Sequence, residues 1–270
     1  MPELPEVETI VRDLDRTVRG RTIRKVEVLR PDLIRGDPEA FARRLRKKRI
    51  ASVTRRAKNI VFDLGADRLI VNLGMTGRLL ATDATEGGDD YLGVRFDLDE
   101  KRRILYRDVR RFGRLEVVEA EEWDRRQGAL GIEPLGADFT PELLHELSRS
   151  SRVAVKTWLM DQKRVVGIGN IYANEALFRA RIDPRKPAQS LTRPRARRLA
   201  EAIREVLREA IEFRGTTLLD YRDASGGEGA FAARLKVYDR KGEPCTVCGK
   251  PIRRIVQGGR STFYCAGCQK

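Results

Sequence analysis

The four cysteines of the chain form two C-x2-C pairs that are separated by sixteen residues: Cys245, Cys248, Cys265 and Cys268. This spacing is typical of a zinc ribbon, in which four thiolates bind one structural Zn²⁺ in tetrahedral geometry. The metal then stabilises a hairpin that is too small to fold around an apolar core of its own. Free cysteines or redox-active pairs are the alternatives, and thiol exchange does not need two such pairs close together.

The first six residues, MPELPE, offer a second kind of chemistry. Removal of Met1, which is usual before a small residue, would leave Pro2 as a secondary amine. A terminal amine titrates near about 8 and a lysine near about 10.4, so the former is neutral far more often at pH 7. Such an amine can attack C1′ of a deoxyribose and expel the base, and Glu3 and Glu6 are placed to move protons. The same residues are equally typical of a helix start with capping acids.

A single histidine, His145, lies in the helix-like segment ELLHELSR. We expect a surface or packing position for it. Acid–base chemistry must therefore rest on carboxylates, lysines or the terminal amine.

The charge of the chain favours a polyanionic partner. Lysine and arginine exceed the acidic residues by 15, and the pI is ≈ 10.1. Such an excess predicts salt-sensitive binding, although a basic soluble protein or a ribosome-associated one is also compatible with it. Arg253, Arg254 and Arg260 lie between the cysteine pairs. The zinc hairpin would thus present cations to a phosphate backbone.

The cysteine distribution and the termini predict a cytosolic protein without a membrane anchor. Apart from the last 26 residues the chain has no cysteine, which is expected in a reducing compartment. The N-terminus lacks the basic and apolar regions of a signal peptide. Apolar stretches are too short for a membrane span.

The hydrophobic pattern changes along the chain. One helix is expected over 4–18, with Pro5 in its first turn, and is followed by strand-like runs. These runs are Thr22–Leu29, Ile50–Thr54, Ile60–Leu64, Leu69–Leu73, Leu92–Leu98, Arg103–Tyr106 and Leu115–Val118. Helices are expected from Thr140-Pro141 onward and over 152–161, 170–180 and 192–213, with a mobile loop at 222–230.

Seven motifs, taken in order, resemble the formamidopyrimidine-DNA glycosylase family nearly from end to end. They are Met1–Thr9 (MPELPEVET), Arg55–Lys58 (RRAK), Leu73–Gly77 (LGMTG), Arg110–Gly113 (RRFG), Gly167–Glu175 (GIGNIYANE), Gly215–Leu218 (GTTL) and the closing CAGCQK. The resemblance implies a bilobal α+β fold. Its expected parts are a catalytic β-sandwich domain with flanking helices (1–135), a helical helix–two-turn–helix DNA-binding domain (136–234) and a four-cysteine zinc finger (235–270).

The resemblance also implies an enzyme of base excision repair, a DNA glycosylase and AP lyase that removes 8-oxoguanine and formamidopyrimidines. Pro2 would be the nucleophile of both steps, forming a Schiff base that leads to β,δ-elimination. Glu3 would act on the sugar ring with support from Glu6. Lys58 would bind the phosphate beside the lesion and assist the eliminations.

Further residues would contact DNA on the same grounds. Met75, Arg110 and Phe112 would fill the gap left by the rotated nucleotide, because an apolar side chain can plug it while arginine binds the orphaned cytosine. Without the motifs, Met75 and Phe112 would be expected in the core. Asn170 and nearby amides would hold phosphates, and Lys156 would approach the lesion.

The implied partner is double-stranded DNA with oxidised purines or abasic sites, lying between the lobes against Lys58, Asn170 and Arg260. The protein would be a monomer of the bacterial cytoplasm, associated with the nucleoid. Two positions depart from the family pattern: Asn72 replaces a usual histidine, and Val109 a usual proline. Neither supplies a nucleophile or a metal ligand.

Three alternatives remain open. An endonuclease VIII-like enzyme would use the same chemistry on oxidised pyrimidines, but Leu4 is more typical of the purine enzymes, since the sister class commonly has glycine there. A catalytically inactive DNA-binding relative would not need Pro2, Glu3 and Lys58. A translation-associated zinc-ribbon protein would explain the charge and the finger, but not the N-terminus.

Overall fold

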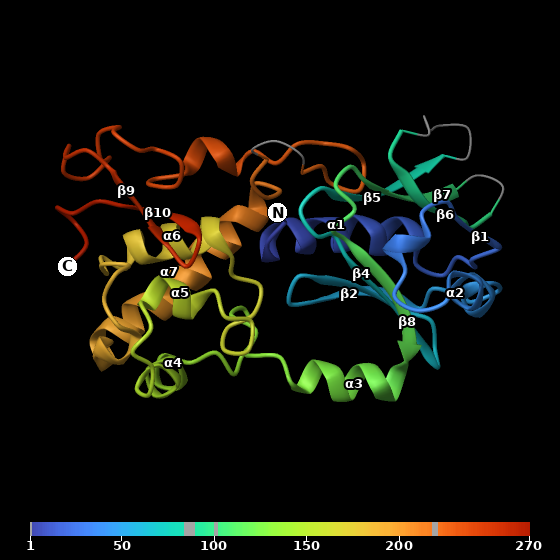
Figure 1. Cartoon of the computed structure of the whole chain (residues 1–270), viewed down its shortest axis with the longest axis horizontal. Coiled ribbons are helices and arrows are strands. Elements are labelled where there is room, and N and C mark those ends of the chain that lie inside the picture. The colour runs from blue at the N-terminus through green and yellow to red at the C-terminus, as the bar shows by residue number, and fades with distance from the viewer. Residues whose placement is uncertain (1, 84–89, 100–101, 218–220) are drawn as a thin grey trace. The chain divides into compact units, whose positions relative to one another are not determined.

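The computed structural model describes residues 2–83, 90–99, 102–217 and 221–270. The chain forms two compact units (Figure 1). Unit 1 consists of Met1–Gly128 and Phe213–Ala232, and unit 2 of Ala129–Glu212 and Ala233–Lys270. The chain thus enters unit 2, returns to unit 1 for one short segment, and ends in unit 2. The three-part division expected from the sequence stays a prediction, and the structure groups 213–232 with the strands.

Unit 1 begins with helix α1 (Leu4–Val18), as expected. Its apolar stripe is buried at Val7, Ile10 and Leu14, which is the spacing of one helical face. The first turn carries a capping box, because the side chains of Glu3 and Glu6 each accept the backbone N–H of the other. Both acids therefore cap the helix, whatever else they do.

Two four-stranded antiparallel sheets lie on either side of α1 (Figure 1). The first has the order β1-β6-β7-β5 and the second the order β2-β3-β4-β8. Their bounds are β1 Lys25–Val28, β2 Ser52–Arg56, β3 Asn59–Asp63, β4 Asp67–Asn72, β5 Gly77–Asp83, β6 Leu92–Asp97, β7 Arg102–Asp108 and β8 Arg114–Glu119. Helices α2 (Pro38–Leu45) and α3 (Ala120–Gly128) and a 3₁₀ turn (Pro31–Leu33) complete the unit before its C-terminal return.

The core of unit 1 lies between α1 and the inner faces of both sheets. Alternate strand residues such as Phe62, Val71, Phe96 and Tyr106 point into it and are essentially fully buried, as the period of a strand requires. Tyr221 of the returning segment packs against the same core. This arrangement confirms the predicted α+β class with an N-terminal β-sandwich.

Unit 2 is mainly helical. Its helices are α4 (Pro141–Ser148), α5 (Val155–Leu159), α6 (Asn170–Arg179) and α7 (Arg193–Glu212), with a 3₁₀ turn at Ala188–Ser190. A further 3₁₀ turn, Phe231–Arg234, begins in the last residues of unit 1 and ends in unit 2. The Thr140 hydroxyl accepts the Leu143 N–H at 3.1 Å and so caps α4, as its sequence predicts. Among the described residues, no helix has the length and apolar character that crossing a bilayer requires.

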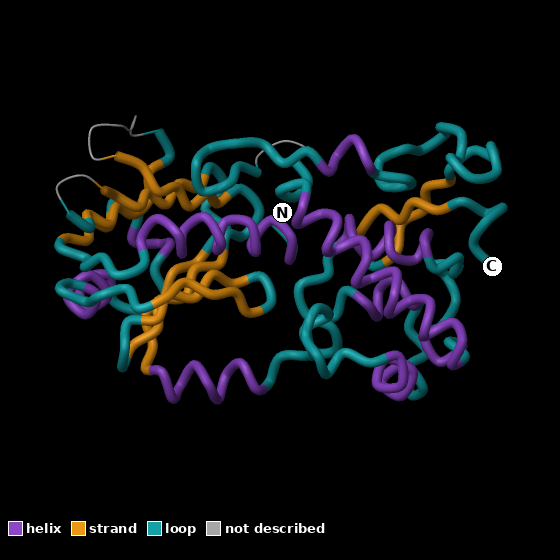
Figure 2. The backbone as a smooth tube through the Cα atoms, turned by 180° about the vertical axis from the view of Figure 1, so that it is seen from behind, coloured by secondary structure: helices purple, strands orange, loops and turns teal. Residues whose placement is uncertain are grey.

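A hairpin of β9 (Arg253–Gln257) and β10 (Arg260–Tyr264) ends the chain and packs beside the helices of unit 2 (Figure 2). Phe263 of the hairpin shares a small apolar cluster with Phe178 of α6. The Asn174 side chain accepts the Phe263 N–H at 2.7 Å, and the Gln269 amide donates to the Ile182 carbonyl at 2.8 Å. The finger is therefore fixed to the end of α6.

Candidate functional site

The N-terminal end of α1 gathers the residues expected to act on the sugar. Pro2 is buried, and Glu3 and Glu6 are 2% and 1% exposed. One oxygen of Glu6 accepts the Glu3 N–H at 2.8 Å, and the other accepts the Thr216 N–H at 2.8 Å. Glu6 therefore ties the helix start to the returning segment and has a fixed orientation.

Gly215 explains part of the GTTL motif. Its φ is +84°, and a Cβ atom there would lie 2.9 Å from the Glu6 carboxylate. Only glycine combines this backbone conformation with so close an approach. Thr217 continues the connection, because its hydroxyl accepts the Gly229 N–H at 2.8 Å. The 215–217 segment thus joins Glu6 to the 222–230 loop.

The 222–230 loop, expected to be mobile, is organised around a buried carboxylate. One oxygen of Asp223 accepts the backbone N–H groups of Ser225 and Gly227, and the other accepts the Arg214 guanidinium at 2.6 Å. Arg214 also donates to Asp13 of α1 at 2.6 Å. Burial would raise the pKa of Asp223, but the hydrogen bonds from Arg214, Ser225 and Gly227 outweigh it and lower that pKa. Sequence reasoning missed this cluster, since nothing in the local pattern marks Asp13 or Asp223 as buried.

Lys58 lies in the two-residue turn between β2 and β3 and is half-buried. Its neighbour Ala57 has φ 56°, a conformation that costs a non-glycine residue about 1 kcal/mol or more. Arg55 supports the turn, because its guanidinium donates to the Ala57 carbonyl at 2.9 Å and to Glu8 of α1 at 3.0 Å. Arg55 thereby holds the Lys58 turn next to the first half of α1.

Met75, Arg110 and Phe112 are all exposed, which excludes the core positions that Met75 and Phe112 would otherwise be given. Met75 is 40% and Phe112 53% exposed. The Arg110 guanidinium lies 4.6 Å from the centre of the Phe112 ring, a distance at which cation and ring attract. Two large apolar side chains and a cation are thus presented together to solvent.

The strand register brings three predicted motifs to one end of one sheet. Asn59, directly after Lys58, pairs with Asn72 at the end of β4. Asn72 also pairs with the first residue of β8, which follows the Arg110–Gly113 loop. Met75 lies in the turn that follows β4. Lys58, Met75 and the Arg110–Gly113 loop therefore lie at the same end of this sheet.

Asn72, where the family usually has histidine, holds the Met75 turn directly. Its side-chain oxygen accepts the Gly74 N–H at 3.0 Å, and its amide nitrogen donates to Asn59 at 2.9 Å. The turn is thus anchored to the neighbouring strand. Val109, at the other departure, is 48% exposed.

In unit 2, Asn170 is the first residue of α6 and is half-buried. Its Oδ1 atom is buried and has no hydrogen-bond partner among the described atoms. The preceding turn is held by Gln162, which accepts the Gly167 N–H at 2.8 Å and donates to the Ile168 carbonyl at 2.9 Å. Gln162 is a positioning residue that the sequence motifs did not reveal.

Lys156 and Arg260 occupy contrasting positions. Arg260 is exposed at the start of β10. Lys156 is 1% exposed, and its Nζ donates to the Ser261 carbonyl at 3.4 Å. Lys156 therefore contacts the finger, and its expected contact with a lesion stays a prediction.

Glu175 joins α6 to the segment that leads into the finger. It is fully buried and accepts the backbone N–H groups of Lys236, Val237 and Tyr238 at 2.9–3.1 Å. Burial raises the pKa of Glu175, and these hydrogen bonds offset part of the rise. The carboxylate thus acts as a connector within unit 2.

The four cysteines fit a single zinc ion. Their Sγ atoms all lie within 4.8 Å of one another, with 3.8 Å between Cys245 and Cys268 and 3.4 Å between Cys248 and Cys265. A tetrahedron with Zn–S bonds of about 2.3 Å has edges of about 3.8 Å. The donor set and its spacing therefore suit one structural Zn²⁺.

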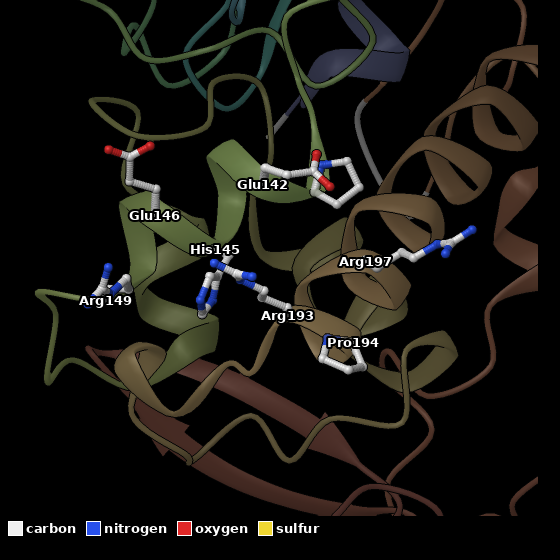
Figure 3. Close-up of a pocket in the computed structure, with 8 residues that line it drawn as sticks. Glu142, His145, Glu146, Arg149, Arg193, Pro194 and Arg197 are labelled. Carbon is white, nitrogen blue, oxygen red and sulfur yellow. The ribbon is translucent and has the colours of Figure 1, made fainter.

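His145 lines a pocket of about 670 Å³ between α4 and α7 (Figure 3). Its Nδ1 lies 2.8 Å from the Leu191 carbonyl and donates to it. Other lining residues are Glu142, Glu146, Arg149, Arg193 and Arg197. The predicted site residues are not among the residues that line this pocket, which agrees with a packing role for His145.

Three family models match the chain in succession. The formamidopyrimidine-DNA glycosylase N-terminal domain matches residues 1–115, and the formamidopyrimidine-DNA glycosylase H2TH domain matches 130–221. The zinc finger found in FPG and IleRS matches 242–270. Together they cover most of both units.

Curated relatives match over the full length. The formamidopyrimidine-DNA glycosylase of Methylobacterium sp. (strain 4-46) is 44% identical over 294 residues, covering 100% of this chain and 99% of the relative. That of Geobacillus kaustophilus is 43% identical over 274 residues, with complete coverage of both.

Solved structures of Lactococcus lactis Fpg match the fold. The complex with DNA containing an abasic site has a TM-score of 0.93 and 32% identity, covering 99% of both chains. The complex with DNA containing N7-benzyl-Fapy-dG has a TM-score of 0.93 and 33% identity, covering 100% of both. Another complex of the same enzyme holds DNA with an oxidised pyrimidine, at a TM-score of 0.92 and 33% identity.

Proposed function

Because the chain belongs to the formamidopyrimidine-DNA glycosylase family, we propose a division of labour among its residues in removing oxidised purines from DNA. The protein is a DNA glycosylase of base excision repair, and its finger carries one structural zinc. The observation that carries the proposal is that Lys58, Met75 and the Arg110–Gly113 loop lie at the same end of the β2-β3-β4-β8 sheet. The groups that bind the backbone and fill the duplex thus share one surface.

The nucleophile is the amine of Pro2 after Met1 has been removed. Its nitrogen lone pair forms a bond to C1′, and the glycosidic bond breaks with its electron pair leaving on the base, which takes up a proton. The proline nitrogen then loses its proton, the C1′–O4′ bond breaks as O4′ takes up a proton, and an iminium forms between the nitrogen and C1′. Loss of a proton from C2′ then expels the 3′ phosphate, and a second elimination expels the 5′ phosphate.

The acids next to Pro2 serve this sequence in two ways. Glu3 follows Pro2 directly and moves a proton at the sugar ring. Glu6 orients the helix start, because each of its oxygens accepts a backbone N–H. Through Thr216 it also fixes the segment leading to the 222–230 loop, which covers the rotated base.

Binding relies on cations and on an apolar wedge. Lys58, on a turn fixed by Arg55, binds the phosphate beside the lesion. Asn170 at the start of α6 and Arg260 on the hairpin bind further phosphates. The exposed side chains of Met75 and Phe112 enter the gap in the stack, as apolar wedges do in other kinked duplexes.

The substrate class is tested with three duplexes that carry 8-oxoguanine, a formamidopyrimidine or thymine glycol. We expect faster base release from both purine lesions. Preference for thymine glycol would instead indicate an endonuclease VIII-like enzyme. Tight binding of all three without strand cleavage would indicate an inactive DNA-binding relative.

We further propose that the protein acts as a monomer on DNA of the bacterial nucleoid. Light scattering of the protein with one lesion duplex should give the mass of a one-to-one complex. A dimer on a single lesion would contradict this.

A further inference from the structure

One buried carboxylate connects the Met75 turn to the Arg110–Gly113 loop. Asp108, the last residue of β7, is 3% exposed. One of its oxygens accepts the Thr76 hydroxyl at 2.5 Å, and the other accepts the Gly113 N–H at 2.7 Å. Thr76 in turn accepts the Arg110 N–H at 3.1 Å. The carboxylate thus bonds to the residue after Met75 and to the residue after Phe112.

The direction of these hydrogen bonds is fixed by chemistry. The Thr76 hydroxyl has one proton, which goes to Asp108, so its lone pair is available for the Arg110 N–H. The Tyr106 hydroxyl faces Asp108 at 3.3 Å and the Asn72 carbonyl at 3.4 Å, and it can only donate to either. Within the described residues, the partners of Asp108 are all donors, and a carboxylate offers acceptors to all of them.

The backbones of the two segments are also in direct contact. A Cβ atom at Gly74 would lie 2.6 Å from the Gly113 nitrogen, and a Cβ atom at Gly113 would lie 1.6 Å from the Tyr106 hydroxyl oxygen. Gly74 has φ +57°, and Arg111 has φ 55° within the loop. Arg111 lies between the Arg110 N–H, which Thr76 accepts, and the Gly113 N–H, which Asp108 accepts, so these two bonds support its strained conformation.

We propose that Asp108 is a positioning residue that locks the Met75 turn to the Arg110–Phe112 loop, so that the three side chains enter the duplex as one preassembled wedge. The inference rests on the proposed role of these side chains in filling the duplex. Asp108 itself does not touch DNA in this role. It acts through the Thr76 hydroxyl and the Gly113 amide.

In this chain the lock acts on a loop that has valine at 109 in place of the family's usual proline. A proline there would restrict φ of the loop by its ring, whereas Val109 does not. The bonds of Asp108 to Thr76 and Gly113 restrict the same segment from both sides. Arg110 can therefore keep a fixed direction toward the orphaned base without the proline.

The test uses two variants that change little in shape. Asp108→Asn replaces one acceptor oxygen by a donor, and Thr76→Val removes the hydroxyl that donates to Asp108 and accepts from Arg110. Thr76→Ser keeps the hydroxyl. Asp97→Asn is the control, because Asp97 accepts the Arg103 guanidinium at the opposite end of the β6–β7 pair from Asp108. Each variant is assayed for excision of 8-oxoguanine opposite cytosine and opposite adenine. A 2-aminopurine beside the orphaned base reports insertion of the wedge independently of chemistry.

Asp108→Asn and Thr76→Val should each slow the 2-aminopurine phase and lower the preference for cytosine over adenine by about 10-fold, because Arg110 loses its fixed direction. Cleavage of a preformed abasic site should fall much less, since less unstacking is needed. Thr76→Ser and Asp97→Asn should resemble the parent. The inference is overturned if both variants melt at lower temperature but keep the parent's insertion phase and opposite-base preference.

Met75→Ala separates this inference from the function on which it rests. If Met75→Ala impairs insertion while Asp108→Asn and Thr76→Val do not, the positioning role of Asp108 is wrong, but the insertion of the apolar side chains into the duplex is supported. If Met75→Ala leaves both insertion and excision unchanged, the proposed insertion of Met75 into the duplex is wrong, and the positioning role of Asp108 that depends on it is wrong as well.

Discussion

Replacing Glu175 by alanine should destabilise unit 2 by about 2–4 kcal/mol. The carboxylate accepts the N–H groups of Lys236, Val237 and Tyr238. Val237 is fully buried, so its amide would be left without a partner at a cost of about 1–3 kcal/mol. Lys236 and Tyr238 are more exposed, and water can replace their bonds. The cavity left by the side chain adds about 1 kcal/mol.

The chain offers a probe for this unit alone. It has two tryptophans, Trp123 in unit 1 and Trp158 in unit 2. In a Trp123→Phe background, urea unfolding followed by Trp158 fluorescence reports unit 2. Glu201→Ala is the control, since Glu201 makes an exposed pair with Arg197 and its loss should change the free energy of unfolding by less than about 0.5 kcal/mol.

Glu175→Gln distinguishes the connector from a merely buried charge. Its remaining oxygen can occupy the position of Oε1, which accepts all three amides, so we expect a loss within about 1 kcal/mol. An alanine variant as stable as the glutamine variant would refute the reasoning from unsatisfied amides.

The contribution of Glu175 to the free energy of unfolding changes with pH in a definite direction. Burial raises the pKa of Glu175 above its ordinary 4.5. A group whose pKa rises on folding contributes its stability fully below the unfolded pKa, and this contribution is lost as pH rises through the folded value. The parent should therefore lose stability relative to Glu175→Gln as pH increases from about 4.5. If the difference in the free energy of unfolding between the parent and Glu175→Gln stayed constant over this pH range, burial would not be the dominant influence on the pKa of Glu175.

Three further predictions follow from the contacts. Gly74→Ala should destabilise unit 1 by about 2–4 kcal/mol, measured through Trp123, because its Cβ would lie 2.6 Å from Gly113 and its φ is positive; an unchanged midpoint would contradict this close approach. Chelation of zinc should abolish tight DNA binding in a mobility-shift assay without changing the Trp123 signal, and full affinity in the chelated protein would contradict the role of the finger. Asn72→Ala should cost about 1 kcal/mol and slow excision, because the Gly74 N–H loses its partner, whereas wild-type excision kinetics would show that the Met75 turn does not need this anchor.

Local patterns in the sequence predicted most elements that bury an apolar face. The stripe of α1 and the strand runs that became β3, β4 and β6 are examples. Among the described α-helices and strands, three were missed: α2, α3 and β5. Helix α3 buries only Trp123 among nine residues and therefore has no apolar stripe, and α2 buries only Phe41 and Leu45. In β5 the adjacent apolar residues Leu79 and Leu80 obscure the alternation of apolar and polar residues that marks a strand.

The connections that hold the site could not be predicted, because they join residues far apart in the chain. Asp108 and Asp223 are unmarked acids in the sequence, and Glu175 is marked only as the end of the GIGNIYANE motif; only the fold shows that each is buried among donors. The return of 213–232 to unit 1 is equally invisible to local patterns. The motifs did predict the cysteine cluster and the exposed positions of Met75 and Phe112, because these depend on spacing and on the family resemblance.

The central claim is that the amine of Pro2 attacks the sugar. Borohydride reduction during turnover of an 8-oxoguanine duplex should trap a covalent protein–DNA adduct, and peptide mapping by mass spectrometry should place the sugar on the nitrogen of Pro2 in protein that has lost Met1. An adduct on Lys58 or another lysine, or undiminished excision by protein that retains Met1, would contradict the account.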